Sequence, residues 1–228
     1  MNFLDSIIRF PLHDLPFILV VILIAFTVHE FAHAYTANKF GDPTAKLLGR
    51  VTLNPAAHID LFGTIMLLIL GFGWARPVPV NRDNFSRPRL MGVIVSAVGP
   101  LSNLLVAFVG TMIFDVLLDH GYISMYETSK WNEAAYYFFF YLINLNISLF
   151  LFNLLPLPPL DGYRIVEDLV PRRFRLVLQQ YEQWASFIFL LFVFLPPLRA
   201  VTLDPLFGLA SDIYNEFNHF YMWIQGMF

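Results

Sequence analysis

Long apolar stretches separated by short polar segments dominate the hydrophobic pattern of this chain. The four longest cover residues 16–37, 91–118, 134–156 and 184–202. Each is close to the roughly 20 residues that a helix needs to cross the hydrocarbon core of a bilayer. A fifth apolar segment, residues 61–73, is too short for a full crossing. The pattern predicts an all-α integral membrane protein with about four transmembrane helices and a short re-entrant segment.

The two ends of the chain carry weaker amphipathic patterns. Residues 1–15 mix large apolar side chains with Asp5, Arg9 and Asp14, which is typical of a short interfacial helix. Residues 205–228 place apolar side chains at helical spacing, and we expect this tail to lie at the interface rather than to span the bilayer. We find no internal repeat, low-complexity tract or linker, which predicts a single domain over residues 1–228 with its core at 16–162.

Two short segments are predicted to form small edge strands. Residues 50–53 and 76–80 alternate in the manner of strands and border turn residues. In the second segment, Pro77 and Pro79 remove N–H donors from one strand edge only. The other edge keeps its donors and could pair with an added strand.

Composition narrows the class of protein. Of the 228 residues, 57% are hydrophobic and only 14% are charged, which is far fewer charges than soluble domains carry. The net charge of −3 says nothing about nucleic acid, but the sequence has no basic arm or patch, so we expect no nucleic-acid partner. Cysteine is absent, so disulfides, thiolate metal ligands and a cysteine nucleophile are all excluded.

The first apolar stretch contains the motif His29-Glu30-Phe31-Ala32-His33. Residues four apart lie on one face of a helix, so His29 and His33 can hold one metal ion between them. Glu30 can then reach a water on that metal without being a ligand. The alternative is a chance motif whose histidines bond to neighbouring groups. Because such side chains are costly in hydrocarbon, a metal site is the better interpretation.

A third ligand is needed, since a catalytic zinc takes three protein ligands and keeps one open position. Asp161 is the best candidate, because it follows a proline-rich break at the end of the third apolar stretch. The other acidic residues near stretch ends resemble solvated charges. His58 could be a substrate-facing group or could support a ligand, although a hydrogen-bonded loop histidine is the alternative.

The basic residues predict the orientation in the membrane. If Asp161 joins the two histidines, the first and third stretches end on the same side, so residues 61–73 must not cross. This arrangement places 11 basic residues on one side and 3 on the other, whereas a crossing would give 9 and 5. By the positive-inside rule, the metal site opens toward the cytoplasm and the protein is a multi-pass plasma-membrane protein.

Three motifs in order, HEFAH, GPLSN and NLLPLPPLDG, resemble those of the site-2 protease family of intramembrane zinc metalloproteases. The segments GRVTLNPAAHIDLFGT and GWARPVPVN resemble its small members, which lack PDZ and CBS domains. The resemblance implies one catalytic Zn²⁺ on His29, His33 and Asp161, with Glu30 as general base. It also implies that Asn153 contacts substrate, and it matches Asn103 to the asparagine of the Gly-Pro motif.

The resulting hypothesis is hydrolysis of peptide bonds within or near transmembrane segments of membrane proteins. A helical substrate would unwind, and the predicted edge strands could receive it by strand addition. Its partners would be a transmembrane protein or peptide, the lipid bilayer and a possible regulator in trans. The alternatives are a metal-binding membrane carrier and a catalytically silent scaffold. The carrier is disfavoured because the apolar stretches show no second ionisable cluster and no inverted repeat.

Overall fold

The computed structural model describes residues 11–70, 73–124 and 129–227, and the regular elements in these ranges are all helices or 3₁₀ turns. The predicted interfacial helix at residues 1–15 lies largely outside them, although residues 12–14 form one 3₁₀ turn. The helices and 3₁₀ turns are η1 (Leu12–Asp14), α2 (Leu15–Lys39), α3 (Thr44–Leu47), η2 (Pro55–Ala57), α4 (Leu61–Leu70), η3 (Arg82–Asn84), α5 (Pro88–Asp119), α6 (Lys130–Asn153), α7 (Asp161–Leu169), α8 (Arg172–Phe194) and α9 (Pro196–Gln225).

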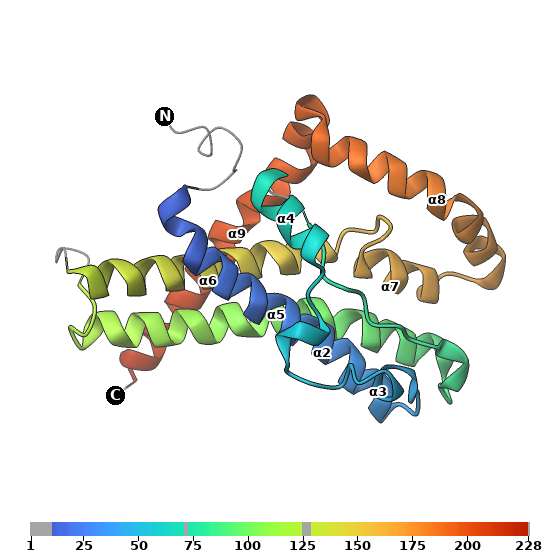
Figure 1. Cartoon of the computed structure of the whole chain (residues 1–228), viewed down its shortest axis with the longest axis horizontal. Coiled ribbons are helices and arrows are strands. Elements are labelled where there is room, and N and C mark those ends of the chain that lie inside the picture. The colour runs from blue at the N-terminus through green and yellow to red at the C-terminus, as the bar shows by residue number, and fades with distance from the viewer. Residues whose placement is uncertain (1–10, 71–72, 125–128, 228) are drawn as a thin grey trace.

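Three of these helices form a bundle that holds the candidate site. Helices α5 and α6 run side by side, and α2 packs across both (Figure 1). Each of the three is long and apolar enough to cross a membrane, in agreement with the first three predicted spans. Ile18, Ile22 and Phe26 on α2 pack against α6, while α4 covers the same cluster from outside. The other helices and turns pack around this three-helix bundle.

The fourth predicted span is broken. Helix α8 ends at Phe194, and α9 begins at Pro196 after a bend of 87°. Pro196 and Pro197 explain the break, because proline has no N–H to continue the ladder but fits the first turn of a new helix. The described residues therefore contain three candidate spans, or four if the bent pair counts as one. The tail that was expected at the interface forms the C-terminal part of helix α9, and its residues Ile213 and Phe217 pack onto the core between α5 and α6.

Helix α5 approaches its neighbours closely because small residues line its buried face. Gly92, Ser96, Gly99, Ala107 and Gly110 are among the residues buried there. Membrane helices use such residues for close contact, since lipid offers no hydrophobic driving force for helix association. This stripe lets α5 touch α2, α6 and α7 at once, which brings distant parts of the sequence to one point.

The predicted small edge strands are not found among the described residues. Residues 73–81 run extended but belong to no ladder, and residues 50–53 form a bend and irregular backbone. The physical reason is that their polar groups have other partners: the N–H of Arg76 donates to the carbonyl of His58 (2.8 Å). The ten-residue α4 is about 15 Å long, too short to cross. Its re-entrant path stays a prediction.

Candidate active site

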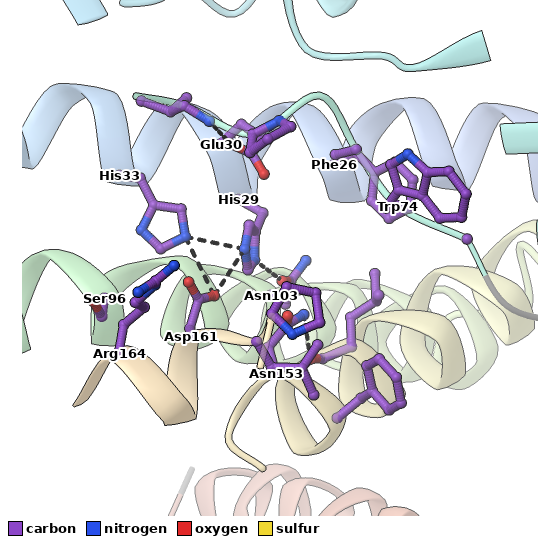
Figure 2. A pocket seen from close by; sticks show the side chains of 18 of the residues that line it. Phe26, His29, Glu30, His33, Trp74, Ser96, Asn103, Asn153, Asp161 and Arg164 are labelled. Carbon is purple, nitrogen blue, oxygen red and sulfur yellow. Dashed lines mark hydrogen bonds and ion pairs between the residues drawn. The ribbon is translucent and has the colours of Figure 1, made fainter. Parts of the chain in front are cut away.

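Helix α2 places three polar side chains on the inner side of the bundle. His29, Glu30 and His33 are 8%, 7% and 8% exposed. The two histidines lie one turn apart, and both rings face α5 and the start of α7 (Figure 2). The helical spacing thus produces the predicted pair, and tertiary packing buries it.

Asp161 lies close to the two histidines because α7 begins next to the end of α6. Helix α6 ends at Asn153, and the proline-rich segment turns the chain so that Asp161 is the first residue of α7. A Cβ on Gly162 would lie 2.2 Å from the carbonyl oxygen of Leu154, so only glycine permits this approach. The Asp161 Oδ2 atom lies 3.1 Å from His29 Nε2 and 3.3 Å from His33 Nε2.

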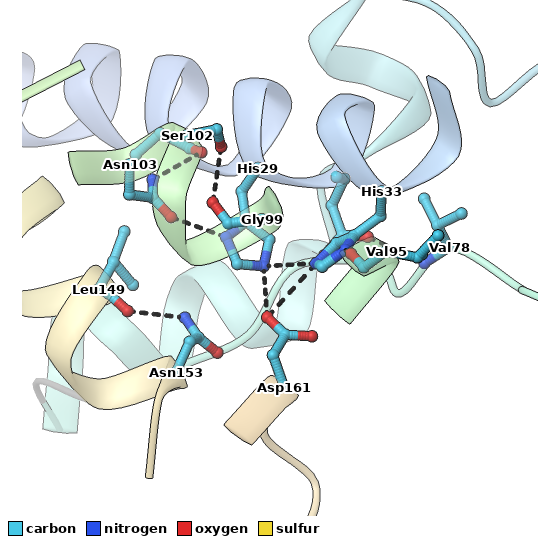
Figure 3. A network of polar contacts seen from close by, with 12 residues as sticks. His29, His33, Val78, Val95, Gly99, Ser102, Asn103, Leu149, Asn153 and Asp161 are labelled. Carbon is cyan, nitrogen blue, oxygen red and sulfur yellow. Dashed lines mark hydrogen bonds and ion pairs between the residues drawn. The ribbon is translucent and has the colours of Figure 1, made fainter. Parts of the chain in front are cut away.

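The other ring nitrogen of each histidine has a partner that fixes the tautomer. His33 Nδ1 lies 2.6 Å from the carbonyl oxygen of Val95, which can only accept, so Nδ1 carries the proton. His29 Nδ1 lies 2.7 Å from Asn103 Oδ1, and the same reasoning applies (Figure 3). Each neutral ring therefore presents the lone pair of its Nε2 atom toward Asp161 and toward the other ring, 3.1 Å away.

This arrangement fits a zinc ion. Two imidazole nitrogens and a carboxylate oxygen converge on one point, a set of donors that suits a zinc ion at the centre. The edges of the donor triangle are 3.1, 3.1 and 3.3 Å. A tetrahedral zinc with bonds of 2.0–2.1 Å requires donor separations of about 3.3 Å. Among the described residues this is also the one group of three side chains assembled closely enough to bind a metal ion.

Glu30 is held in place by backbone from a different part of the chain. Its Oε2 atom accepts a hydrogen bond from the N–H of Val78 (2.9 Å). Arg76, in the same extended segment, accepts from the buried guanidinium of Arg50 through its carbonyl oxygen (2.5 Å). Of the three donors that the sequence left available for strand pairing, on Arg76, Val78 and Val80, those of Arg76 and Val78 are therefore engaged within this chain.

A cavity of about 880 Å³ opens against the donor triangle. Helices α2, α5, α6 and α9 contribute to its wall, together with segment 73–80 and the start of α7 (Figure 2). Its lining is mostly apolar and includes Phe26, Trp74, Leu149, Phe152, Leu203 and Phe207. An apolar cavity with a few convergent polar groups is typical of a substrate-binding site.

The remaining predicted site residues have different positions. Asn153 lines the cavity, and its Nδ2 donates to the carbonyl of Leu149 (3.0 Å). Asn103 also borders the cavity, but it is fully buried and its side-chain oxygen contacts the ring of His29. His58 is fully buried outside the cavity lining, with Nε2 2.8 Å from the carbonyl oxygen of Thr52. The structure does not bring His58 to the site, and it has the hydrogen-bonded loop position that was its alternative.

Sequence reasoning missed two contributors. Asn146 contacts Asn103, and the N–H of Val78 bonds to Glu30. A signal existed for Asn146, because an amide in an apolar span requires a partner. For Val78, the flanking prolines marked an unusual backbone but did not indicate what it contacts.

A buried donor triangle, a neighbouring glutamate and an apolar cavity inside a bundle of membrane-length helices define a membrane-embedded metallohydrolase. The chain belongs to Peptidase family M50, whose sequence pattern matches residues 17–196. It is a zinc metalloprotease, with zinc as its cofactor.

Curated relatives agree with this assignment. The chain is 49% identical over 209 residues to "Putative zinc metalloprotease YwhC" of Bacillus subtilis (strain 168), covering 92% of this chain and 94% of that protein. It is 31% identical over 179 residues to "Putative zinc metalloprotease Rip2" of Mycobacterium tuberculosis (strain ATCC 25618 / H37Rv), covering 77% and 65%. No solved structure matches the chain.

Proposed function

We propose that this enzyme hydrolyses peptide bonds within or next to the transmembrane segments of other membrane proteins. The observation that carries the proposal is the position of the site: the donor triangle lies inside the helix bundle, and the cavity beside it is walled by membrane-length helices. A protease built for soluble substrates has no need of a buried site among such helices. An apolar cavity of about 880 Å³ suits an unwound stretch of an apolar segment.

His29, His33 and Asp161 are the proposed zinc ligands. Zinc held by these donors would polarise the scissile carbonyl and lower the pKa of the attacking water. The chain supports this role by orienting both rings, through Asn103 for His29 and through Val95 for His33. Such partners fix the direction of each lone pair before a metal binds.

Glu30 is the proposed general base. It would take a proton from the attacking water and deliver it to the leaving amine. The N–H of Val78 holds one of its two carboxylate oxygens, so the carboxylate has a fixed orientation and the other oxygen is left for proton transfer. Glu30 lines the same cavity as the three ligands, which keeps the base and the substrate on one side of the site.

We propose that substrate reaches the site along the cavity, because residues 76–79 leave no N–H for strand addition. The N–H groups of Arg76 and Val78 already donate within the chain, and Pro77 and Pro79 have none to offer. Asn153 lines the cavity and keeps its side-chain oxygen available to accept a backbone N–H from an unwound substrate.

We also propose that the protein lies in the plasma membrane with the site open to the cytoplasm. The 11 to 3 distribution of basic residues supports this orientation. Water would enter from that side, where α7 and the loops around α3 and η3 lie. The timing and choice of cleavage would come from a regulator in trans.

The test compares the wild type with Glu30→Gln, after reconstitution with single-span peptides and detection of internal cleavage by mass spectrometry. Gln keeps the size of Glu30 and an oxygen for the Val78 N–H, but it cannot act as a base. Zinc content should stay the same, and the cleavage rate should fall by about 10²–10⁴-fold. The matched control is Glu216→Gln, which changes an exposed glutamate on α9 and should cleave like the wild type.

Three outcomes would count against the proposal. Equal cleavage by Glu30→Gln at equal zinc content would show that Glu30 is not the base. Metal movement across vesicles without any peptide cleavage would favour a carrier. A wild type that binds zinc but neither cleaves nor transports would favour a scaffold.

A further inference from the structure

A chain of hydrogen bonds connects the candidate zinc site to a side chain on α6. Asn103 on α5 donates from Nδ2 to Asn146 Oδ1 (2.8 Å), and Asn146 donates from Nδ2 to the carbonyl of Leu142 (2.7 Å). Asn103 Oδ1 in turn faces His29 Nδ1 (2.7 Å). Asn103 and Asn146 are both 0% exposed, so no solvent competes for these bonds.

The donor and the acceptor of every hydrogen bond in this series follow from the last bond, which joins Asn146 to Leu142. The carbonyl of Leu142 can only accept, so the amide nitrogen of Asn146 must face it and the oxygen of Asn146 must face α5. That oxygen accepts a hydrogen from Asn103, as does the carbonyl of Ala25 (3.2 Å). Both hydrogens of the Asn103 amide are thereby used, and its oxygen is turned toward His29.

We infer that Asn146 is a positioning residue that selects the tautomer of His29. With the Asn103 oxygen opposite Nδ1, the stable neutral form of His29 carries its proton on Nδ1 and presents a bare Nε2 to Asp161 and His33. The opposite tautomer would aim an N–H at the place where a metal must bind. The inference rests on the proposed role of His29 as a zinc ligand.

The alternative is that Asn146 simply holds α5 and α6 together. Helix α6 itself argues against that view. Asn144 makes the same bond four residues back, to the carbonyl of Phe140 (2.8 Å), yet it is exposed and lies outside the lining of the cavity. A hydrogen bond from an asparagine amide to the carbonyl four residues earlier is thus made on this helix with or without a contact to the site. In Asn146 the bond additionally directs the side-chain oxygen at Asn103.

The experiment measures zinc affinity and the ring-nitrogen NMR shifts of zinc-free, ¹⁵N-histidine-labelled protein. The variants are Asn146→Leu, which removes the oxygen, and Asn146→Asp, which keeps it. Asn144→Leu is the matched control on the same helix. We expect zinc to bind about 10–100-fold more weakly to Asn146→Leu, the range typical of lost ligand support. Its His29 signal should also shift from the Nδ1–H tautomer toward a mixture.

Asn146→Asp should bind zinc within about threefold of the wild type, since Asn103 keeps its acceptor. A purely interhelical role predicts a different result for Asn146→Leu: the bond between α5 and α6 is lost and the melting temperature falls, but the His29 tautomer stays as in the wild type. An unchanged His29 tautomer in Asn146→Leu would overturn the inference. If Asn146→Leu does not fold, the tautomer and zinc affinity of Asn146→Asp decide. Failure of the proposed function differs from both, because the wild type would then bind no zinc through His29.

Discussion

Replacing Gly99 by alanine should disrupt the zinc site through a single methyl group. Gly99 lies on α5 beside both proposed histidine ligands, and Figure 3 shows it between them and Asn103. A Cβ at this position would lie 2.2 Å from His33 Nε2 and 2.9 Å from His29 Cε1. Ordinary contacts of a Cβ begin near 3.4 Å, so the His33 ring would have to move by at least 1.2 Å.

The ring cannot move that far and still serve as a ligand. Zinc–ligand distances tolerate about 0.2 Å of error. Movement would also break the bond from His33 Nδ1 to the carbonyl of Val95, whose length is 2.6 Å. Because a misplacement of about 1 Å in an active site can cost about 10²-fold in rate, we expect at least that loss of cleavage, together with sharply reduced zinc occupancy.

The assay is zinc content by mass spectrometry of the purified protein, paired with peptide cleavage and thermal unfolding. Gly110→Ala is the control, because its Cβ would lie 3.2 Å from the flexible end of Leu142 and in ordinary contact with Ile143, at 3.5 Å. Both changes replace a glycine inside α5, so any gain in helix propensity is shared. Full zinc occupancy and normal cleavage in Gly99→Ala would refute the close packing of α5 against the two ligands.

Two further predictions concern the surroundings of the site. Asp42 is buried after the end of α2, and hydrogen bonds from Thr44, Asn81 and Asn84 outweigh the burial and lower the pKa of its carboxyl. Its stabilising contribution should therefore be complete at neutral pH and fade below about pH 4, so Asp42→Asn should lower the melting temperature at pH 7, and this difference should shrink as the pH falls below about 4. Cysteines placed at exposed Lys46 and Asp83 should both label from the cytoplasmic side; labelling from opposite sides would show that α4 crosses the membrane.

The helical part of the site could be predicted from sequence because its rules are local. Spacing places His29 and His33 on one face whatever the rest of the chain does. The break before Asp161 could also be predicted, since three prolines cannot continue a helix. The structure adds the reason that the two parts meet, which is the approach of α7 to α6 permitted by Gly162. That contact depends on tertiary packing and leaves no local signal beyond the glycine itself.

The orientation of the ligands could not be predicted in this way. Asn146 and Asn144 are two residues apart and make the same backbone bond, yet only Asn146 reaches Asn103. The difference lies in which face of α6 meets α5, and a mostly apolar helix carries little periodicity to reveal it. For the same reason, alternation predicted an edge strand at residues 76–80, whereas the structure has no strand there and the N–H groups of Arg76 and Val78 bond to His58 and Glu30.

The Pro77-Val78-Pro79 sequence acquires a different meaning once these partners are known. Three residues of extended backbone contain a single N–H, and that N–H bonds to Glu30. A segment with ordinary residues at 77 and 79 would offer more donors and would be open to pairing by a substrate strand on its other edge. With proline at both positions, the segment cannot be extended through donors on that edge, and the wall beside the base keeps one conformation. The polar groups of the motif are then held by other elements: His29 and His33 by α5, with support from α6 for His29, and Glu30 by this segment. The motif on α2 supplies the chemical groups, and the packing of the other elements gives them the directions that a zinc ion requires.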